Sequence, residues 1–222
     1  MAALELHTSL SHAPELERPA SLVFDLDPGP PADIVLCCQV ALWLRDILAA
    51  HGLTAFPKTS GSKGMQLYVP LNTDGGYDAT KTAALGLAQR LEREHPDAVV
   101  STMEKARRGG KVFIDWSQND QHKTTVNVYS LRARPRPTVS TPVTWGEVDA
   151  CLLAKDAGLL VFEAGTVVER VDKQGDLFAP LLTLEQHLPP ALLEGVEAPT
   201  VDPSQRKAAW ARRRELEKAR QP

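Results

Sequence analysis

The sequence has no long hydrophobic run and only a few cysteines, and each shortage excludes a class of protein. No stretch of the 222 residues approaches the roughly 20 consecutive apolar residues of a membrane-spanning helix. The first twelve residues, MAALELHTSLSH, have no basic region and carry Glu5 among their apolar positions, unlike a secretion signal. The 3 cysteines, two of them adjacent at Cys37 and Cys38, do not make a disulfide framework or a structural zinc site. We therefore expect a protein of the reducing cytoplasm with no membrane partner.

Positive charge is concentrated in one part of the chain, although the whole chain has a net charge of −3. Residues 104–139 hold eight Lys and Arg against three acids, which gives this segment +5 and leaves −8 for the remainder. A basic segment in an acidic protein is typical of a site for phosphates or a nucleic-acid backbone, but it also occurs as a solvated surface. Charge alone leaves both interpretations open.

Strand and helix patterns alternate along the chain, which predicts an α/β or α+β fold with a mixed central sheet flanked by helices. Apolar runs bounded by Pro and Gly predict strands over residues 21–26, 54–58, 65–70, 98–103, 111–116, 124–131 and 159–163. Helical periodicity and end signals predict helices over residues 31–51, 78–95 and 144–155.

The apolar pattern stops near Pro190, and the end of the chain has a different composition. Residues 204–221 hold seven Lys and Arg against two Glu, with Trp210 as the one large aromatic side chain. We expect one domain over residues 1–190, followed by a linker and a loosely attached basic tail over residues 191–222.

Three carboxylates lie at the ends of apolar strands. Asp25 and Asp27 are two positions apart, so strand alternation places both on one face of a sheet. Asp115 ends a second apolar strand. Acids in such positions are costly unless a cation joins them, and Mg²⁺ or Mn²⁺ suits oxygen ligands. Two carboxylates alone are weak support for a metal site, whereas three on neighbouring strands indicate two-metal phosphoryl or nucleotidyl transfer.

Residues 58–64, KTSGSKG, have the composition of a phosphate-binding turn. Two glycines permit a tight turn, while Ser60, Ser62 and Lys63 supply hydroxyl and ammonium donors. The segment is not a Walker A loop, because the GxxxxGK[ST] pattern is absent and a strand follows it. By itself it is more typical of a surface hairpin loop.

Arginines are the third component of the predicted site. Arg107 and Arg108 lie in a basic turn before Asp115, and Arg132 and Arg134 follow the strand at 124–131. Arginines beside a group of carboxylates can bind a triphosphate whose metal ions are held by those carboxylates, so that no charge of either sign is left unpaired.

A haloacid-dehalogenase-type phosphatase is a poorer match to FDLDP, because Gly29 replaces the Thr or Val it needs and no acidic pair follows late in the chain.

Four blocks together resemble the polymerase module of bacterial ATP-dependent DNA ligase D, of the archaeo-eukaryotic primase superfamily. They are FDLDPGP at 24–30, KTSGSKG at 58–64, VFIDWSQN at 112–119, and YSLRARP at 129–135 continuing into VSTPVTW at 139–145. The resemblance implies a primase-like fold with an RRM-like sheet. It also implies addition of nucleotides, with a preference for ribonucleotides, at DNA ends during double-strand-break end joining in the nucleoid, beside Ku and a ligase.

The resemblance also implies roles for individual residues, with two Mg²⁺ or Mn²⁺ ions as cofactor and nucleoside triphosphates as substrate. Asp25, Asp27 and Asp115 match the metal-binding carboxylates, Ser60 and Lys63 the triphosphate-binding loop, and Arg108, Gln118 and Arg132 the nucleotide contacts. From the basic segment we further expect Arg107, Arg134 and Arg136 to bind DNA.

The sequence departs from the family pattern in two places. Gln66 replaces the family's active-site His; it can donate a hydrogen bond to a nucleotide but cannot carry positive charge. The family's N-terminal part, which helps bind the DNA 5′-phosphate and the base, is expected to be missing. Three interpretations remain open: an active DNA-end nucleotidyltransferase, a non-catalytic descendant that binds DNA or a repair partner, and a remnant without function.

Overall fold

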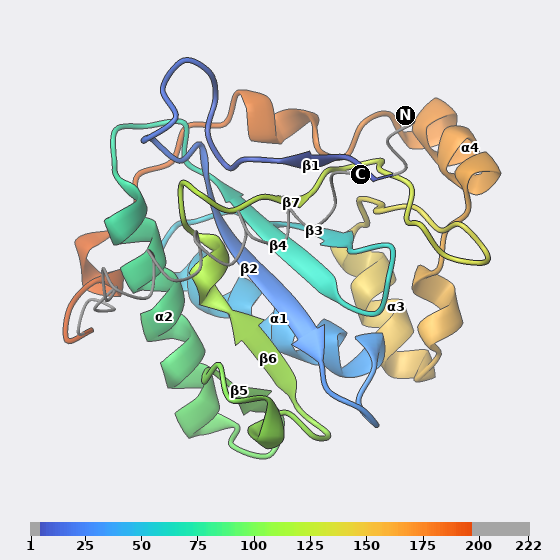
Figure 1. The fold of residues 1–222 in the computed structure, drawn as a ribbon, viewed down its shortest axis with the longest axis horizontal. Coiled ribbons are helices and arrows are strands. Elements are labelled where there is room, and N and C mark those ends of the chain that lie inside the picture. Colours follow the sequence, from blue (N-terminus) through green and yellow to red (C-terminus); the bar gives the residue numbers. More distant parts are fainter. Residues whose placement is uncertain (1–4, 197–222) are drawn as a thin grey trace, which may run out of the picture.

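A five-stranded mixed sheet forms the centre of the structure, a computed structural model that describes residues 5–196 (Figure 1). The strand order is β3–β4–β2–β6–β5. The strands are β2 (Ser21–Pro28), β3 (Phe56–Thr59), β4 (Met65–Pro70), β5 (Val99–Val100) and β6 (Val112–Asp115). Neighbouring strands are antiparallel except for the parallel pair β5–β6. The predicted mixed sheet is confirmed.

One face of this sheet packs against two long helices, α1 (Ile34–Ala50) and α2 (Tyr77–Glu94). Helix α1 passes behind the sheet in Figure 1. It begins after Asp33, whose side chain accepts a hydrogen bond from the Val35 N–H, as an N-cap does. Alternate residues of β2, including Phe24 and Leu26, face these helices and are fully buried in the main core. The residues between them therefore face the opposite side.

The remaining elements surround the sheet. A two-stranded ribbon of β1 (His7–Thr8) and β7 (Thr125–Val126) lies near one end, and α3 (Trp145–Ala154) packs against α1. Helix α4 (Ala164–Gln174) follows. Short 3₁₀ helices are η1 (Lys105–Arg107), η2 (Trp116–Gln118), η3 (Ala157–Leu160), η4 (Ala179–Leu182) and η5 (Pro190–Leu192). No helix within residues 5–196 is long and apolar enough to cross a membrane.

Three predicted strands differ from the structure. The strand predicted at 159–163 is wrong: Asp156 caps the 3₁₀ helix η3, and the extended residues after it share only one hydrogen bond with the chain at Val139. The strand predicted at 124–131 is shortened to β7, because Tyr129 has a positive φ of 61° that ends an extended run. The strand predicted at 98–103 is shortened to β5, where the Ser101 N–H and hydroxyl donate instead to the Glu92 carboxylate.

The described chain continues past Pro190 into η5, whose Leu192 is buried in the main core. The expected basic tail over residues 204–221 lies outside the described residues, as do Met1 to Leu4.

Candidate functional site

The three predicted carboxylates lie together on the sheet face that the long helices leave uncovered. Asp25 of β2 is the cross-strand partner of Asp115 on β6, and residues directly opposite in a ladder share a face. Asp27 is two positions further along β2 and pairs with Phe113. All three acids are therefore on one face, as alternation predicted for Asp25 and Asp27.

A continuous row of polar side chains crosses this face through Asp25. On the other side of β2, Asp25 pairs with Gln66 of β4, and Gln66 pairs with Lys58 of β3. The row thus reads Lys58, Gln66, Asp25, Asp115 over four adjacent strands. We call these four residues the polar row.

The electrostatic environment of the acids is unbalanced. Burial raises the pKa of Asp25 to about 7, and the nearby negative charges of Asp27 and Asp115 act in the same direction. A hydrogen bond from Gln66 and the positive charge of Lys58 oppose this rise. Burial also raises the pKa of Asp27, against the charges of Lys63 and Arg108. Burial thus disfavours the ionised forms of Asp25 and Asp27, and the cations nearby offset this only in part.

Asp115 is fixed by the residues that follow it. Its Oδ1 accepts hydrogen bonds from the Ser117 N–H at 3.1 Å and the Ser117 hydroxyl at 2.5 Å. The Gln118 amide donates to its Oδ2 at 3.4 Å, and Lys123 donates to the Ser117 hydroxyl. The 3₁₀ helix η2 begins at this point because the Asp115 side chain caps it. The predicted nucleotide contact Gln118 therefore lies directly beside the acids.

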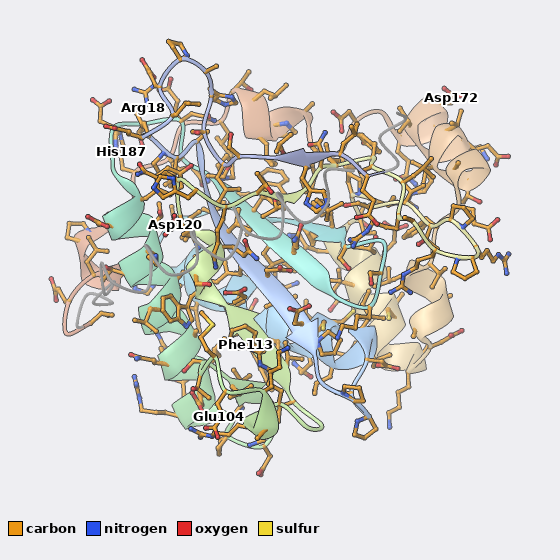
Figure 2. All side chains as sticks on the ribbon, in the orientation of Figure 1. Arg18, Glu104, Phe113, Asp120, Asp172 and His187 are labelled. Carbon is orange, nitrogen blue, oxygen red and sulfur yellow. The ribbon has the colours of Figure 1, made fainter. Side chains whose placement is uncertain are left out.

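Asp27 lies between two cations from different elements. Lys63 comes from the loop before β4, and its ammonium group donates to the Pro28 carbonyl at 3.5 Å. Arg108 follows η1, and its guanidinium lies 3.6 Å above the Phe113 ring. Figure 2 shows Phe113 on β6, with Glu104 near the same end of the molecule, where η1 begins. Both predicted cations therefore flank the end of β2.

Residues 60–64, here called the Gly/Ser loop, form the turn between β3 and β4. The Ser60 hydroxyl accepts hydrogen bonds from the N–H groups of Ser62 and Gly64, each at 3.2 Å. These two N–H groups therefore serve the loop itself rather than pointing freely outward. Gly64 is required, because a Cβ there would lie 2.2 Å from the Leu26 carbonyl oxygen of β2. The loop thus lies directly against the strand that carries Asp25 and Asp27.

A second segment holds the Gly/Ser loop from the other side. The Arg132 guanidinium donates to the Ser60 carbonyl at 2.7 Å, and Arg134 donates to the Ser62 hydroxyl. The Thr138 hydroxyl donates to the Gly61 carbonyl, where Gly61 has a positive φ of 65°. The structure therefore brings Arg132 and Arg134 to the loop, although both are far from it in sequence.

The two remaining predicted DNA-binding arginines each pair with an acid. Arg107 lies 3.3 Å from the Glu92 carboxylate, and Arg136 pairs with Glu163. Both arginine side chains are more than half exposed, at 57% and 84%. Exposed ion pairs of this kind contribute little and can be exchanged for phosphate contacts.

The residue types on this face fit a divalent cation. Carboxylate and amide oxygens are the ligands that Mg²⁺ and Mn²⁺ prefer. The Gln66 and Gln118 carbonyl oxygens are buried without a hydrogen-bond partner beside Asp25 and Asp115. Within residues 5–196, no three His, Cys, Asp or Glu side chains already lie close enough to enclose a metal ion. Binding one therefore requires the carboxylates to turn toward a common point.

Comparison with known proteins identifies the family. The family model for the LigD primase-polymerase domain matches residues 1–178. The chain belongs to the LigD primase-polymerase family. A LigD from Mycobacterium tuberculosis, described as a multifunctional non-homologous end joining DNA repair protein, is 46% identical over 160 residues. These residues are 72% of this chain and 20% of the relative.

Other LigD relatives agree with this assignment. The Bacillus subtilis bifunctional non-homologous end joining protein LigD is 33% identical over 174 residues, or 78% of this chain and 28% of that protein. The chain thus spans between about a fifth and a third of these curated relatives. A solved polymerase domain of M. tuberculosis ligase D, in complex with DNA, has a TM-score of 0.73 and 42% identity. That match covers 81% of this chain and 63% of the solved chain, and it confirms the primase-polymerase fold.

Several residues that shape the site carry no assigned role in the sequence-based prediction. Lys58 has 1% exposure and belongs to the polar row, and Ser117 holds Asp115. Asn119 is fully buried and bonds both the N–H and the carbonyl of Val23 in β2. A signal was present for Ser117, because an Asp followed two residues later by Ser is typical of a side-chain turn. No local signal marks Lys58 or Asn119.

Proposed function

We propose that the chain is a DNA-end nucleotidyltransferase of the primase-polymerase type, which adds nucleotides by two-metal catalysis. The observation that carries the proposal is the sheet face on which Asp25, Asp27 and Asp115 meet, bordered by the Gly/Ser loop and by Arg108. The solved relative is in complex with DNA, which supports DNA as the substrate to be extended.

The residues of this face have separate roles in the proposal. Asp25, Asp27 and Asp115 would hold two Mg²⁺ or Mn²⁺ ions. Such ions lower the pKa of an attacking hydroxyl and neutralise a triphosphate. Lys63 and Ser60 bind the triphosphate at the end of β2, where Lys63 already lies beside Asp27.

The nucleotide is held from two further sides. Arg132 fixes the Gly/Ser loop by its bond to the Ser60 carbonyl, pairs with Glu5 at 3.2 Å, and would exchange that pair for a phosphate bound at the loop. Arg108 and Gln118 lie on the β6 side, and each has a buried polar atom without a partner, Nε of Arg108 and Oε1 of Gln118. Gln66 offers a third such atom, Oε1, beside Asp25. Partnerless buried atoms are costly, and a bound nucleotide would supply their partners.

In the cell, the proposal places this activity in double-strand-break end joining in the cytoplasm, at the nucleoid. The LigD relatives are named for non-homologous end joining, which supports this assignment. Ku and a DNA ligase are the proposed partners. Arg107, Arg134 and Arg136 would contact the DNA backbone around the site.

The test is primer extension with Mn²⁺, using ribonucleoside and deoxynucleoside triphosphates in separate reactions. We expect extension by the unaltered chain and a loss of at least about 100-fold, or about 2.7 kcal/mol, in Asp25→Ala. The matched control is Asp172→Ala on the exposed surface of α4 (Figure 2), which should extend as the parent does. If the unaltered chain binds DNA but does not extend the primer, the proposal is overturned in favour of a non-catalytic DNA-binding protein.

A further inference from the structure

Lys58 is a buried lysine that the proposed function leaves without a role. Burial lowers the pKa of its ammonium group to about 7, and the charge of Asp25 opposes this fall. Lys58 has 1% exposure, although lysine is almost never fully buried unless it is paired. Its ammonium group donates to the Val126 carbonyl at 3.1 Å and the Ser140 hydroxyl at 2.6 Å. It also lies 5.7 Å from the centre of the Tyr68 ring. Within residues 5–196, no carboxylate lies within hydrogen-bond distance of this ammonium group.

The position of Lys58 in the polar row places it near the acids. Gln66 lies between Lys58 and Asp25 in the cross-strand register, and Lys58 and Asp25 attract each other electrostatically. Neighbouring strands are about 4.8 Å apart, so two strand spacings bring the residues within about 10 Å. At that distance, in a partly buried site, a single charge changes cation binding measurably.

Lys58 is also connected to the Gly/Ser loop. The Ser140 hydroxyl that accepts from Lys58 donates in turn to the Thr59 carbonyl at 3.1 Å. Thr59 immediately precedes the loop. Its N–H donates to the Thr141 carbonyl at 2.8 Å, and the Thr141 N–H donates to the Thr59 hydroxyl oxygen at 3.2 Å. A chain of hydrogen bonds therefore runs from the Lys58 ammonium group to the start of the loop.

We infer that Lys58 is a positioning residue of the nucleotide-addition site, with two effects. In its protonated form Lys58 offsets the negative charge of the ionised acids when no divalent cation is bound, and its bond to Ser140 holds the Gly/Ser loop in place for the triphosphate. This inference rests on the proposed function for its second effect only. The first effect concerns cation binding and can be tested without any activity.

Removing the charge of Lys58 should change the affinities for Mn²⁺ and for ATP in opposite directions. Lys58→Met keeps a long side chain but deletes the ammonium group. We expect Mn²⁺ to bind on the order of tenfold more tightly, because a positive charge no longer repels it. We expect ATP to bind on the order of tenfold more weakly, because the loop loses one of its supports. A variant that was merely less stable would not gain affinity for Mn²⁺.

Two further variants separate the effects. Ser140→Ala removes the hydroxyl that links Lys58 to Thr59 but leaves the charge, so it should weaken ATP binding and leave the affinity for Mn²⁺ unchanged. Lys81→Met is the matched control, because Lys81 is also buried, at 8% exposure, but pairs directly with a carboxylate, that of Asp120, at 2.8 Å. It should change neither affinity.

The measurement is calorimetric titration of the full chain with Mn²⁺ alone and then with ATP, with thermal unfolding recorded for each variant. Unchanged or weaker Mn²⁺ binding by a folded Lys58→Met would overturn the charge effect. If Lys58→Met does not fold, normal ATP binding by Ser140→Ala would overturn the loop effect. Absence of primer extension by the parent chain would count against the proposed function alone, because the Mn²⁺ titration does not depend on it.

Discussion

Asp25 lies at the centre of the site and has other site residues beside it on both neighbouring strands. It has a carboxylate on one side in Asp115, a second at Asp27, and the Gln66 amide on the other side. Burial and, to a lesser degree, repulsion from the neighbouring carboxylates raise the pKa of Asp25 to about 7, so the metal-free protein favours its protonated form below about pH 7. A bound divalent cation would reverse that preference.

This arrangement predicts how Asp25→Asn changes stability with pH. The pKa of Asp25 is about 7 in the folded protein and 3.8 in the absence of its surroundings, so the folded state holds an extra proton between these values. The free energy of unfolding therefore falls as pH rises from about 4 to 7. Asp25→Asn removes this loss, and at pH 8 in EDTA we expect it to be on the order of 2 kcal/mol more stable than the parent.

Urea unfolding from pH 4 to pH 8 provides the measurement. The difference between Asp25→Asn and the parent should vanish near pH 4, where both side chains are neutral. Asp172→Asn on exposed α4 serves as the control and should follow the parent throughout. An Asp25→Asn protein that is less stable than the parent at pH 8 would show that burial and neighbouring charges do not destabilise the ionised carboxylate.

At the residue scale, the sequence predicted the acids but not their neighbours. Strand alternation is sufficient to place Asp25 and Asp27 on one face, whereas the shared face of Asp115 follows from the β2–β6 register, which the fold sets. Lys58 is different, because its burial depends on Val126 and Ser140, which are 68 and 82 residues away in sequence. Only the fold brings these partners to it.

At the scale of elements, the Gly/Ser loop depends on close contact with β2. A Cβ at Gly64 would lie 2.2 Å from the backbone oxygen of Leu26, which neither strand can move to accommodate. We expect Gly64→Ala to lower the free energy of unfolding by about 1–3 kcal/mol and to raise the KM for ATP, since the loop must shift. Gly75→Ala is the control, because nothing lies within 4 Å of a Cβ there. Equal KM values for the two variants would contradict the role of this contact.

Elements with local signals were predicted well. Helix α3 begins with Thr144 and Glu147, which form the capping box that the sequence indicated. The strand expected at 159–163 was wrong although its apolar residues alternate, with Leu160 and Phe162 buried. Alternation reports which side chains are buried, but a strand also needs a neighbouring backbone to pair with, and that partner is set by the fold.

At the scale of the whole molecule, a basic border surrounds an acidic centre. Arg107 and Arg108 lie on the β6 side of the end of β2, and Lys63, Arg132 and Arg134 lie on the Gly/Ser loop side. The segment 104–139, with its net +5, supplies all of these except Lys63. DNA binding through this border should therefore be mainly electrostatic.

The expected result is a linear fall of log affinity for DNA ends with log salt concentration. Deleting residues 204–222 removes seven Lys and Arg, so the slope should become shallower. Fluorescence anisotropy with a labelled duplex between 50 and 300 mM KCl, about a sixfold range, measures both slopes. An affinity that does not change with salt would contradict an electrostatic interface, and equal slopes would show that residues 204–222 take no part.

The most direct test of the account is to locate Mn²⁺ and a non-hydrolysable ATP analogue in crystals of the full chain by anomalous scattering. The account predicts Mn²⁺ peaks between Asp25, Asp27 and Asp115, with the triphosphate running toward Lys63 and Ser60. In Asp27→Asn crystals treated in the same way, these peaks should be lost or much reduced. Mn²⁺ bound elsewhere, or a triphosphate away from the Gly/Ser loop, would contradict the assignment of this sheet face as the site of nucleotide addition.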